Sequence, residues 1–98
     1  MRSKEDFLVY CCRVCGFDYD AIGCEPSEFP WHEHGKSPTF DNCVCCGSEF
    51  GFHDYTRKKT LESRENWIQE GMTFDLPQFK PVSWNAEEQL NTIPEEFR

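Results

Sequence analysis

Two short cysteine motifs constrain the fold of this 98-residue chain more than any other feature of its sequence. Each has the pattern Cys-x-x-Cys-Gly, and they occupy residues 12–16 and 43–47. A gap of two residues lets a tight turn point both sulfur atoms to the same side, and the glycine permits the positive φ that closes such a turn. Two such turns can supply four thiolates to one tetrahedral ion. We therefore predict a metal site formed by Cys12, Cys15, Cys43 and Cys46.

The two motifs also form a faint internal repeat. An alignment that places Cys12 on Cys43 also matches Asp18 with Glu49, and an aromatic residue follows each acidic one. Each copy therefore has the pattern of a turn that leads into a short aromatic strand. We expect two such hairpins, or knuckles, to face each other across the metal.

Three further cysteines, Cys11, Cys24 and Cys45, bring the total to seven. An odd number, in a chain that we expect to have no secretion signal, favours reduced thiols and a metal over a disulfide scaffold. Cys11 and Cys45 each lie beside a proposed ligand, so either could replace it in a shifted register. The acidic Glu25 and Glu28 near Cys24 are expected to raise its pKa, so we predict no catalytic cysteine and no enzyme.

Zinc is the metal that we expect at this site. A zinc site with four thiolates is closed to further ligands, so it stabilises a fold instead of catalysing a reaction. Its binding free energy, on the order of 10 kcal/mol, then acts as folding free energy for a small core. Iron is the alternative, because tetrahedral sulfur ligation suits both metals.

The first motif and the residues after it, Cys12 to Asp20, resemble the first knuckle of rubredoxins. The acidic composition and the second Cys-x-x-Cys-Gly motif are also similar to that family. Rubredoxins normally have proline after the first cysteine of the second knuckle, where this chain has Val44, and here residues 48–98 follow that knuckle. This resemblance implies the alternative function, a rubredoxin-like iron protein that transfers electrons.

Several further motifs accompany the two cysteine motifs along most of the chain. They are Phe29-Pro30-Trp31, residues 37–41, Glu49-Phe50-Gly51, Arg64-x-x-Trp67-Ile68-x-x-Gly71, Trp84-Asn85 and residues 88–90. Together these motifs resemble small bacterial cysteine-rich proteins of the CPCC type, except that Val44 stands where that motif has its proline. The resemblance implies a zinc-ribbon-like bacterial protein with no assigned activity.

The charge of the chain restricts its partners. Ten basic and eighteen acidic residues give a formal net charge of −8, which opposes attraction to phosphates and to anionic lipid. A nucleic-acid-binding zinc ribbon is therefore only the second alternative. No apolar run approaches the roughly 20 residues of a membrane span, and no phosphate-binding loop or small-molecule substrate is indicated. We expect a cytoplasmic protein whose acidic, aromatic surface binds a basic protein partner, with an inhibitory or immunity-like role among the options.

The loop between the knuckles contains several prolines and two histidines, His32 and His34. Phe29, Trp31 and Phe40 are expected to anchor this loop to the knuckles. The two histidines could form a second metal site if His53 folds nearby. Solvated loop histidines are the alternative that we favour.

Thr56 to Glu70 is the best candidate for a helix. We expect Asp54 to cap its start, with Leu61, Trp67 and Ile68 on its buried face. Residues 72–84, with two prolines, suggest an extended strap laid across the domain. Asn85 followed by acidic residues predicts a short final helix at Ala86–Asn91.

These observations predict a single domain, residues 1–98, of the small α+β class. Residues 1–55 would form a two-knuckle metal domain of the zinc-ribbon or rubredoxin-like type, and residues 56–98 the helix, the strap and the short final helix. The function that we expect is non-catalytic. A zinc site holds the fold, and the surface binds a protein partner.

Overall fold

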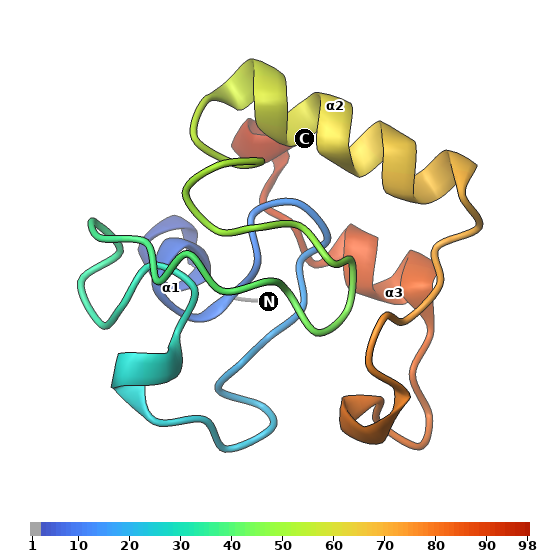
Figure 1. The fold of residues 1–98 in the computed structure, drawn as a ribbon, viewed down its shortest axis with the longest axis horizontal. Helices are drawn as coiled ribbons and strands as arrows, with labels where there is room; N and C mark the ends of the chain where they lie inside the picture. Colours follow the sequence, from blue (N-terminus) through green and yellow to red (C-terminus); the bar gives the residue numbers. More distant parts are fainter. Residues whose placement is uncertain (1–2) are drawn as a thin grey trace.

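The computed structural model describes residues 3–98, and its framework consists of short helices around two cysteine turns (Figure 1). The α-helices are α1 (Lys4–Tyr10), α2 (Arg57–Gln69) and α3 (Ala86–Asn91), and the 3-10 segments are η1 (Pro26–Glu28), η2 (Pro77–Phe79) and η3 (Glu95–Phe97). The described residues fit within 31 × 29 × 24 Å. Helices on the outside and long irregular connections between them define this fold.

Strand pairing within residues 3–98 is limited to two isolated antiparallel bridges, Cys11 with Asp18 and Asn42 with Glu49. The expected aromatic strands are therefore wrong as extended elements, and the β part of the α+β prediction shrinks to these bridges. Each bridge closes one knuckle at the same position of the repeat, so the internal repeat is confirmed. Beyond each bridge the chain turns away at once, which leaves no second pair to extend a ladder.

The two cysteine turns have the same backbone geometry. In each, the amide of the first cysteine donates to the carbonyl of the residue after the glycine, at 2.9 Å from Cys12 to Phe17 and 2.8 Å from Cys43 to Ser48. The glycine that ends each turn has a φ of +86° in the first knuckle and +77° in the second. A side chain is strained in this left-handed region, which explains the glycine in both motifs.

The helix α2 lies at nearly its predicted bounds, but the predicted cap, Asp54, is wrong. Thr56 is the N-cap, and its side-chain oxygen accepts a hydrogen bond from the amide of Lys59 at 3.1 Å. The proposed cap, Asp54, is buried and accepts hydrogen bonds from Nε1 of Trp31 (2.8 Å) and from the amide of Gly51 (2.6 Å). Its carboxylate therefore ties the loop between the knuckles to the second knuckle.

The buried face of α2 also differs from the prediction. Trp67 is buried as expected, but its buried neighbours are Thr60 and Arg64, while Ile68 is 37% exposed and Leu61 is only half-buried. The helix packs against the backbone of the first knuckle, and backbone carbonyls there require donors. A polar side chain on this face therefore replaces the expected aliphatic ones.

The helix α1 was not predicted, because its seven residues carry no clear periodicity. Ser3 caps it by accepting a hydrogen bond from the amide of Asp6 at 3.2 Å. Its single buried residue, Phe7, stacks on Phe97 near the C-terminus with ring centroids 5.5 Å apart. This contact brings the two ends of the described chain together.

The last helix, α3, has the predicted bounds, and Asn85 caps it by accepting from the amide of Glu88 at 2.9 Å. The strap before it lies along the second knuckle. There the amide of Asp75 donates to the carbonyl of Cys45, and the amide of Leu76 to that of Val44, both at 2.9 Å. Two hydrogen bonds thus attach this segment beside the cysteines, but it is not extended throughout as predicted, because η2 (Pro77–Phe79) interrupts it.

The loop between the knuckles is anchored by two of the three expected aromatic residues. Phe29 and Trp31 are buried, and the guanidinium of Arg13 lies 4.0 Å above the ring of Trp31. The third, Phe40, is 61% exposed and has a φ of +65°, so its predicted role as an anchor is wrong. Its ring lies against Gly51.

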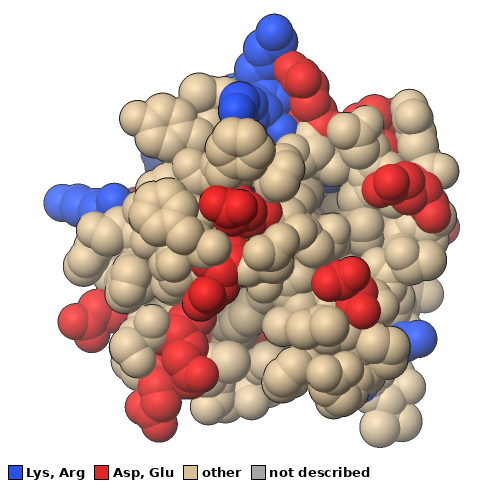
Figure 2. Space-filling model, viewed as in Figure 1, with Lys and Arg blue, Asp and Glu red and all other residues tan. Residues whose placement is uncertain are grey.

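Among the charged side chains on the face seen in Figure 2, the acidic ones cover more of the surface than Lys and Arg. They are spread across that face, whereas Lys and Arg lie at a few places near its edge. This distribution agrees with the net charge of −8. The visible face therefore presents a negative potential to an approaching molecule.

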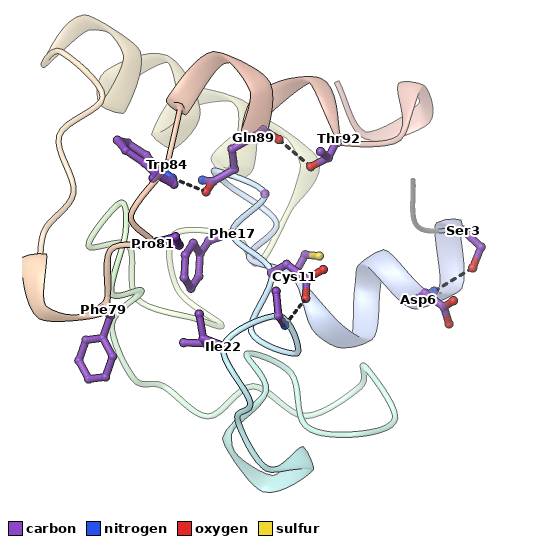
Figure 3. Close-up of a pocket in the computed structure, with 13 residues that line it drawn as sticks. Ser3, Asp6, Cys11, Phe17, Ile22, Phe79, Pro81, Trp84, Gln89 and Thr92 are labelled. Atoms are coloured by element: carbon purple, nitrogen blue, oxygen red, sulfur yellow. Dashed lines mark hydrogen bonds between the residues drawn. The ribbon is translucent and has the colours of Figure 1, made fainter.

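A cavity of about 760 Å³ lies between the first knuckle and the strap (Figure 3). Phe17, Ile22 and Pro81 form an apolar wall, and Trp84 lies above them with its indole nitrogen donating to Oε1 of Gln89 at 2.8 Å. The residues around this cavity include none of the four predicted metal ligands. It is therefore separate from the candidate metal centre.

Candidate metal centre

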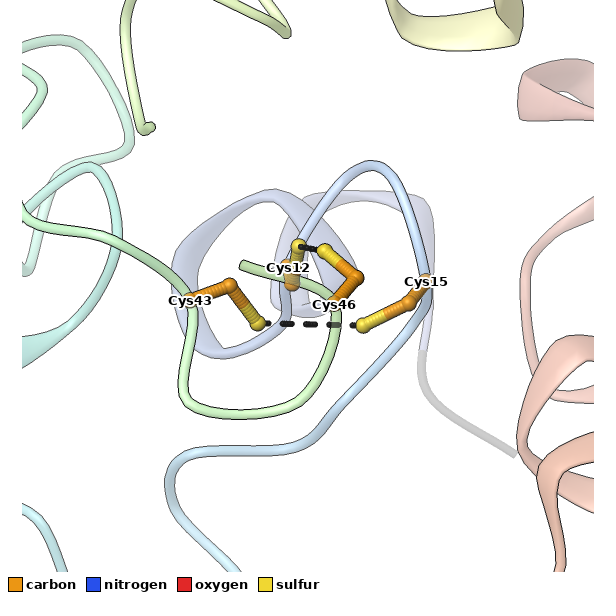
Figure 4. A group of neighbouring side chains, drawn as sticks. All are labelled: Cys12, Cys15, Cys43 and Cys46. Carbon is orange, nitrogen blue, oxygen red and sulfur yellow. Dashed lines mark hydrogen bonds between the residues drawn. The ribbon is translucent and has the colours of Figure 1, made fainter. Parts of the chain in front are cut away.

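The four predicted ligands meet at one point between the two knuckles (Figure 4). The sulfur atoms of Cys12 and Cys46 are 3.7 Å apart, and those of Cys15 and Cys43 are 3.8 Å apart. All four sulfur atoms lie within 4.8 Å of one another. Each close pair joins one knuckle to the other, so the cluster exists only because the two turns face each other.

These distances fit a tetrahedral ion. A metal–sulfur bond of about 2.3 Å in a regular tetrahedron separates neighbouring sulfur atoms by about 3.8 Å. The two close pairs already have this separation, and the wider pairs need only a small inward shift. The cluster is therefore suited to a metal ion, and because zinc and iron share this ligand set and geometry, the distances do not distinguish between them.

Burial distinguishes one ligand from the other three. Cys12, Cys15 and Cys43 have no exposed surface, whereas Cys46 is partly exposed. An apolar surrounding strengthens the attraction between thiolates and a cation, since no water screens it. The centre is therefore closed on three sides and accessible on the fourth.

The ionisation of the thiols reflects this burial. Burial raises the pKa of Cys12 and of Cys15 well above the ordinary value for a thiol. Burial acts the same way on Cys43, but hydrogen bonds from the neighbouring thiols and from Tyr19 overcome it and lower the pKa of Cys43 well below that value. Cys43 is therefore the thiol whose ionised form these contacts favour, and a bound dication would favour the thiolates of all four cysteines.

Val44 occupies a position where proline would lose a contact. Its amide donates a hydrogen bond to the hydroxyl of Tyr19 at 3.0 Å. Proline has no amide hydrogen and could not make this contact. The amide of Cys45 in turn lies 3.4 Å from the sulfur of Cys43 and donates to it. Two consecutive amides of the second knuckle therefore have different partners: that of Val44 contacts the first knuckle, and that of Cys45 supports the sulfur of Cys43.

Arg64 of α2 holds the first knuckle from outside. Its Nε donates to the carbonyl of Val14 at 2.7 Å, and one terminal nitrogen donates to that of Arg13 at 2.8 Å. The other terminal nitrogen donates to the carbonyl of Phe97 at 2.9 Å. One planar guanidinium thus connects the residues between Cys12 and Cys15 to the C-terminal segment.

Gln89 of α3 makes a comparable link from the other side. Its side-chain amide donates to the carbonyl of Cys15 at 3.1 Å and to the sulfur of Cys45 at 3.4 Å. Sequence reasoning missed both Arg64 and Gln89 as supports of the site. Both residues lie in motifs that carry the CPCC resemblance, but neither those motifs nor helical periodicity distinguishes Arg64 from a solvated arginine.

The structure also places the three remaining cysteines. The sulfur of Cys45 lies against Gln89, outside the cluster, and Cys11 is buried with Phe7 and Ile93. Cys24 is partly exposed, and its pKa is raised by burial and by Glu28. The shifted registers that used Cys11 or Cys45 are therefore not those of the structure.

The histidines do not assemble a second metal site. The rings of His32 and His34 stack with centroids 6.2 Å apart, while Nδ1 of His53 accepts from the amide of Glu49 at 2.9 Å. Within residues 3–98, the four-cysteine cluster is the only group of three or more potential ligands that gathers closely enough to hold an ion. The interpretation of His32 and His34 as loop histidines therefore stands.

No known protein family, curated protein or solved structure matches this chain. No helix in the described part of the chain is long and apolar enough to cross a membrane. The class of protein is thus defined by its own geometry, as a small cysteine-rich protein with few helices, almost no strands and a four-cysteine cluster suited to a metal ion.

Proposed function

We propose that this chain is a non-catalytic zinc-binding protein. Cys12, Cys15, Cys43 and Cys46 hold one zinc ion, and the ion stabilises the packing of the two knuckles. The observation that carries the proposal is the sulfur cluster itself, with close pairs at 3.7 and 3.8 Å, the separation of a tetrahedral zinc–thiolate site. A family assignment to the CPCC type of zinc-ribbon-like protein rests on the resemblance of the sequence motifs.

The low content of regular structure supports a structural role for the metal. The backbone bridges of the knuckles are single, and the helices α1 and α3 have seven and six residues. Isolated helices of this length are unstable in water, so their stability must come from packing. A metal that joins both knuckles provides a fixed centre for that packing.

The proposed partner is a basic protein. The acidic face in Figure 2 and the net charge of −8 both favour a positively charged surface. Four thiolates with one zinc dication add further negative charge. Affinity capture with the zinc-loaded protein tests this. We expect a basic protein that is retained at low salt and released at high salt, and capture of acidic proteins only would refute the proposal.

Iron in place of zinc remains the second candidate, with electron transfer as its function. The specific observation in its favour is the partial exposure of Cys46, because a sulfur ligand near the surface gives a redox partner electronic contact with the metal. The same four cysteines serve both candidates.

Metal analysis with a visible spectrum tests the proposal. Protein purified without added metal should contain one zinc per chain and show no colour, whereas one iron per chain with strong visible absorption would select the electron carrier. The variant Cys15→Ser should lose the metal, and the matched control Cys24→Ser, outside the cluster, should retain it. A folded, metal-free wild-type protein would refute both candidates.

A further inference from the structure

One ligand of the cluster faces a polar cleft. A cavity of about 500 Å³ opens beside Cys46, and His53, Ser63, Asn66 and Glu70 lie around it. The other three ligands have no exposed surface. A water-soluble reagent that approaches the metal centre through this cleft therefore reaches Cys46 before the other three cysteines.

The sulfur of Cys46 has a second sulfur atom, that of Cys12, close beside it. The sulfur of Cys12 is 3.7 Å from that of Cys46, and Figure 4 shows the two atoms side by side, one from each knuckle. A disulfide needs about 2.05 Å between its sulfur atoms, so modest side-chain rotations could close the gap. An accessible thiolate beside a second, buried thiolate is the arrangement of a redox-sensitive pair.

We propose that Cys46 is a modification site for hydroperoxides, and that its oxidation forms a disulfide with Cys12 and releases the zinc ion. This inference rests on the proposed zinc site. Oxidation and reduction of these two cysteines would make zinc binding reversible, which a purely structural site does not require. The hydroperoxide enters through the polar cleft.

The reaction balances in two steps. The Cys46 thiolate attacks one oxygen of hydrogen peroxide, the O–O bond breaks, and a sulfenic acid and hydroxide form. The Cys12 thiolate then attacks the Cys46 sulfur, the S–O bond breaks, an S–S bond forms and a second hydroxide leaves. Overall, two thiolates lose two electrons and peroxide gains them.

The consequence for the metal follows from the number of ligands. After the disulfide forms, only Cys15 and Cys43 remain as thiolates, and a structural zinc site requires four protein ligands. Zinc therefore dissociates. A dithiol reductant reverses the change by thiol–disulfide exchange, which regenerates both thiolates and oxidises the dithiol to its own disulfide.

The test begins with zinc-loaded protein, whose metal content is measured before any oxidant is added. Hydrogen peroxide is then added, zinc release is followed with a chromogenic zinc indicator, and the disulfide is located by peptide mass spectrometry. We expect one zinc released per chain, a bond between Cys12 and Cys46, and rebinding of zinc after dithiothreitol treatment.

Two ligand variants separate the accessible position from a buried one. Cys46→His keeps a four-ligand zinc site but removes the accessible sulfur, and we expect release to slow by about tenfold or more. Cys43→His makes the same exchange at a buried ligand and should release zinc at close to the wild-type rate. Equal rates for Cys46→His and wild type would overturn the inference.

A second pair of variants leaves all four thiolates in place. Asn66→Trp places an indole in the cleft, whereas Ile68→Trp places the same indole on α2 beside a different groove. We expect slower release only for Asn66→Trp. A disulfide that excludes Cys46 would also overturn the inference while leaving the zinc site intact. A protein with no zinc before oxidation would instead refute the proposed function.

Discussion

Replacing Arg64 by methionine tests how α2 holds the first knuckle. The wild-type guanidinium donates three hydrogen bonds, of 2.7, 2.8 and 2.9 Å, to the carbonyls of Val14, Arg13 and Phe97. Hydrogen bonds to a charged group each contribute about 1.5–3 kcal/mol, but bonds that share one side chain are not additive. Methionine recovers some apolar contact and leaves the carbonyls unsatisfied. We expect the free energy of unfolding to fall by about 3–4 kcal/mol.

Urea denaturation of the zinc-loaded protein, followed by circular dichroism, measures this loss. Arg57→Met is the matched control, because Arg57 is exposed on the same helix and donates one hydrogen bond to the carbonyl of Arg98. We expect it to cost less than about 1 kcal/mol. Arg64→Lys should fall between the two, since an ammonium lacks the planar fork. The reasoning is refuted if Arg64→Met destabilises no more than Arg57→Met.

Three further predictions concern the knuckles and their metal. In urea denaturation, Gly16→Ala should lower the free energy of unfolding more than Gly47→Ala. Both variants force alanine into a left-handed backbone, at a cost of about 1–2 kcal/mol, but only Gly16→Ala places its Cβ 2.9 Å from Ile93. Equal losses of stability would contradict this prediction. Burial raises the pKa of Tyr19 above its value in the unfolded chain. The contribution of Tyr19 to stability is therefore present below its unfolded pKa and is lost as the pH rises above it. Ultraviolet titration of the folded protein to about pH 11 should give the same tyrosinate signal for wild type and Tyr19→Phe, and a smaller signal in the variant would contradict this. Removal of zinc with a chelator should remove a free energy on the order of 10 kcal/mol and unfold the chain, and an unchanged circular dichroism spectrum would show that the metal does not hold the fold.

Local signals were the ones that sequence analysis interpreted correctly. The bounds of α3 follow from Asn85 and the acidic residues after it, which act within one helical turn. The four ligands follow from a cysteine spacing that defines a turn regardless of the rest of the chain. The sequence also offered Thr56 as the cap of α2. Threonine is a preferred N-cap residue, and it directly precedes the first helical residue, whereas Asp54 lies two positions earlier.

Features that depend on distant residues were missed for a physical reason. Carbonyls of the first knuckle determine which side chains of α2 are buried. No pattern within the helix indicates that Arg64 donates hydrogen bonds to them. Asp54 was misread in the same way, since its partner Trp31 lies in the loop between the knuckles. The stability of α1 likewise depends on the stacking of Phe7 with Phe97.

The sequence by itself determined the four cysteines in two turns, the net negative charge and the short helix α3 with its Asn85 cap. These depend on neighbours along the chain, so they can be recognised without the fold. Only the tertiary structure decided that the sulfur of Cys45 lies against Gln89, and that Cys46 is the one partly exposed residue of the four in the cluster. Accessibility is a property of all the packed elements together, which is why residue spacing could not supply it.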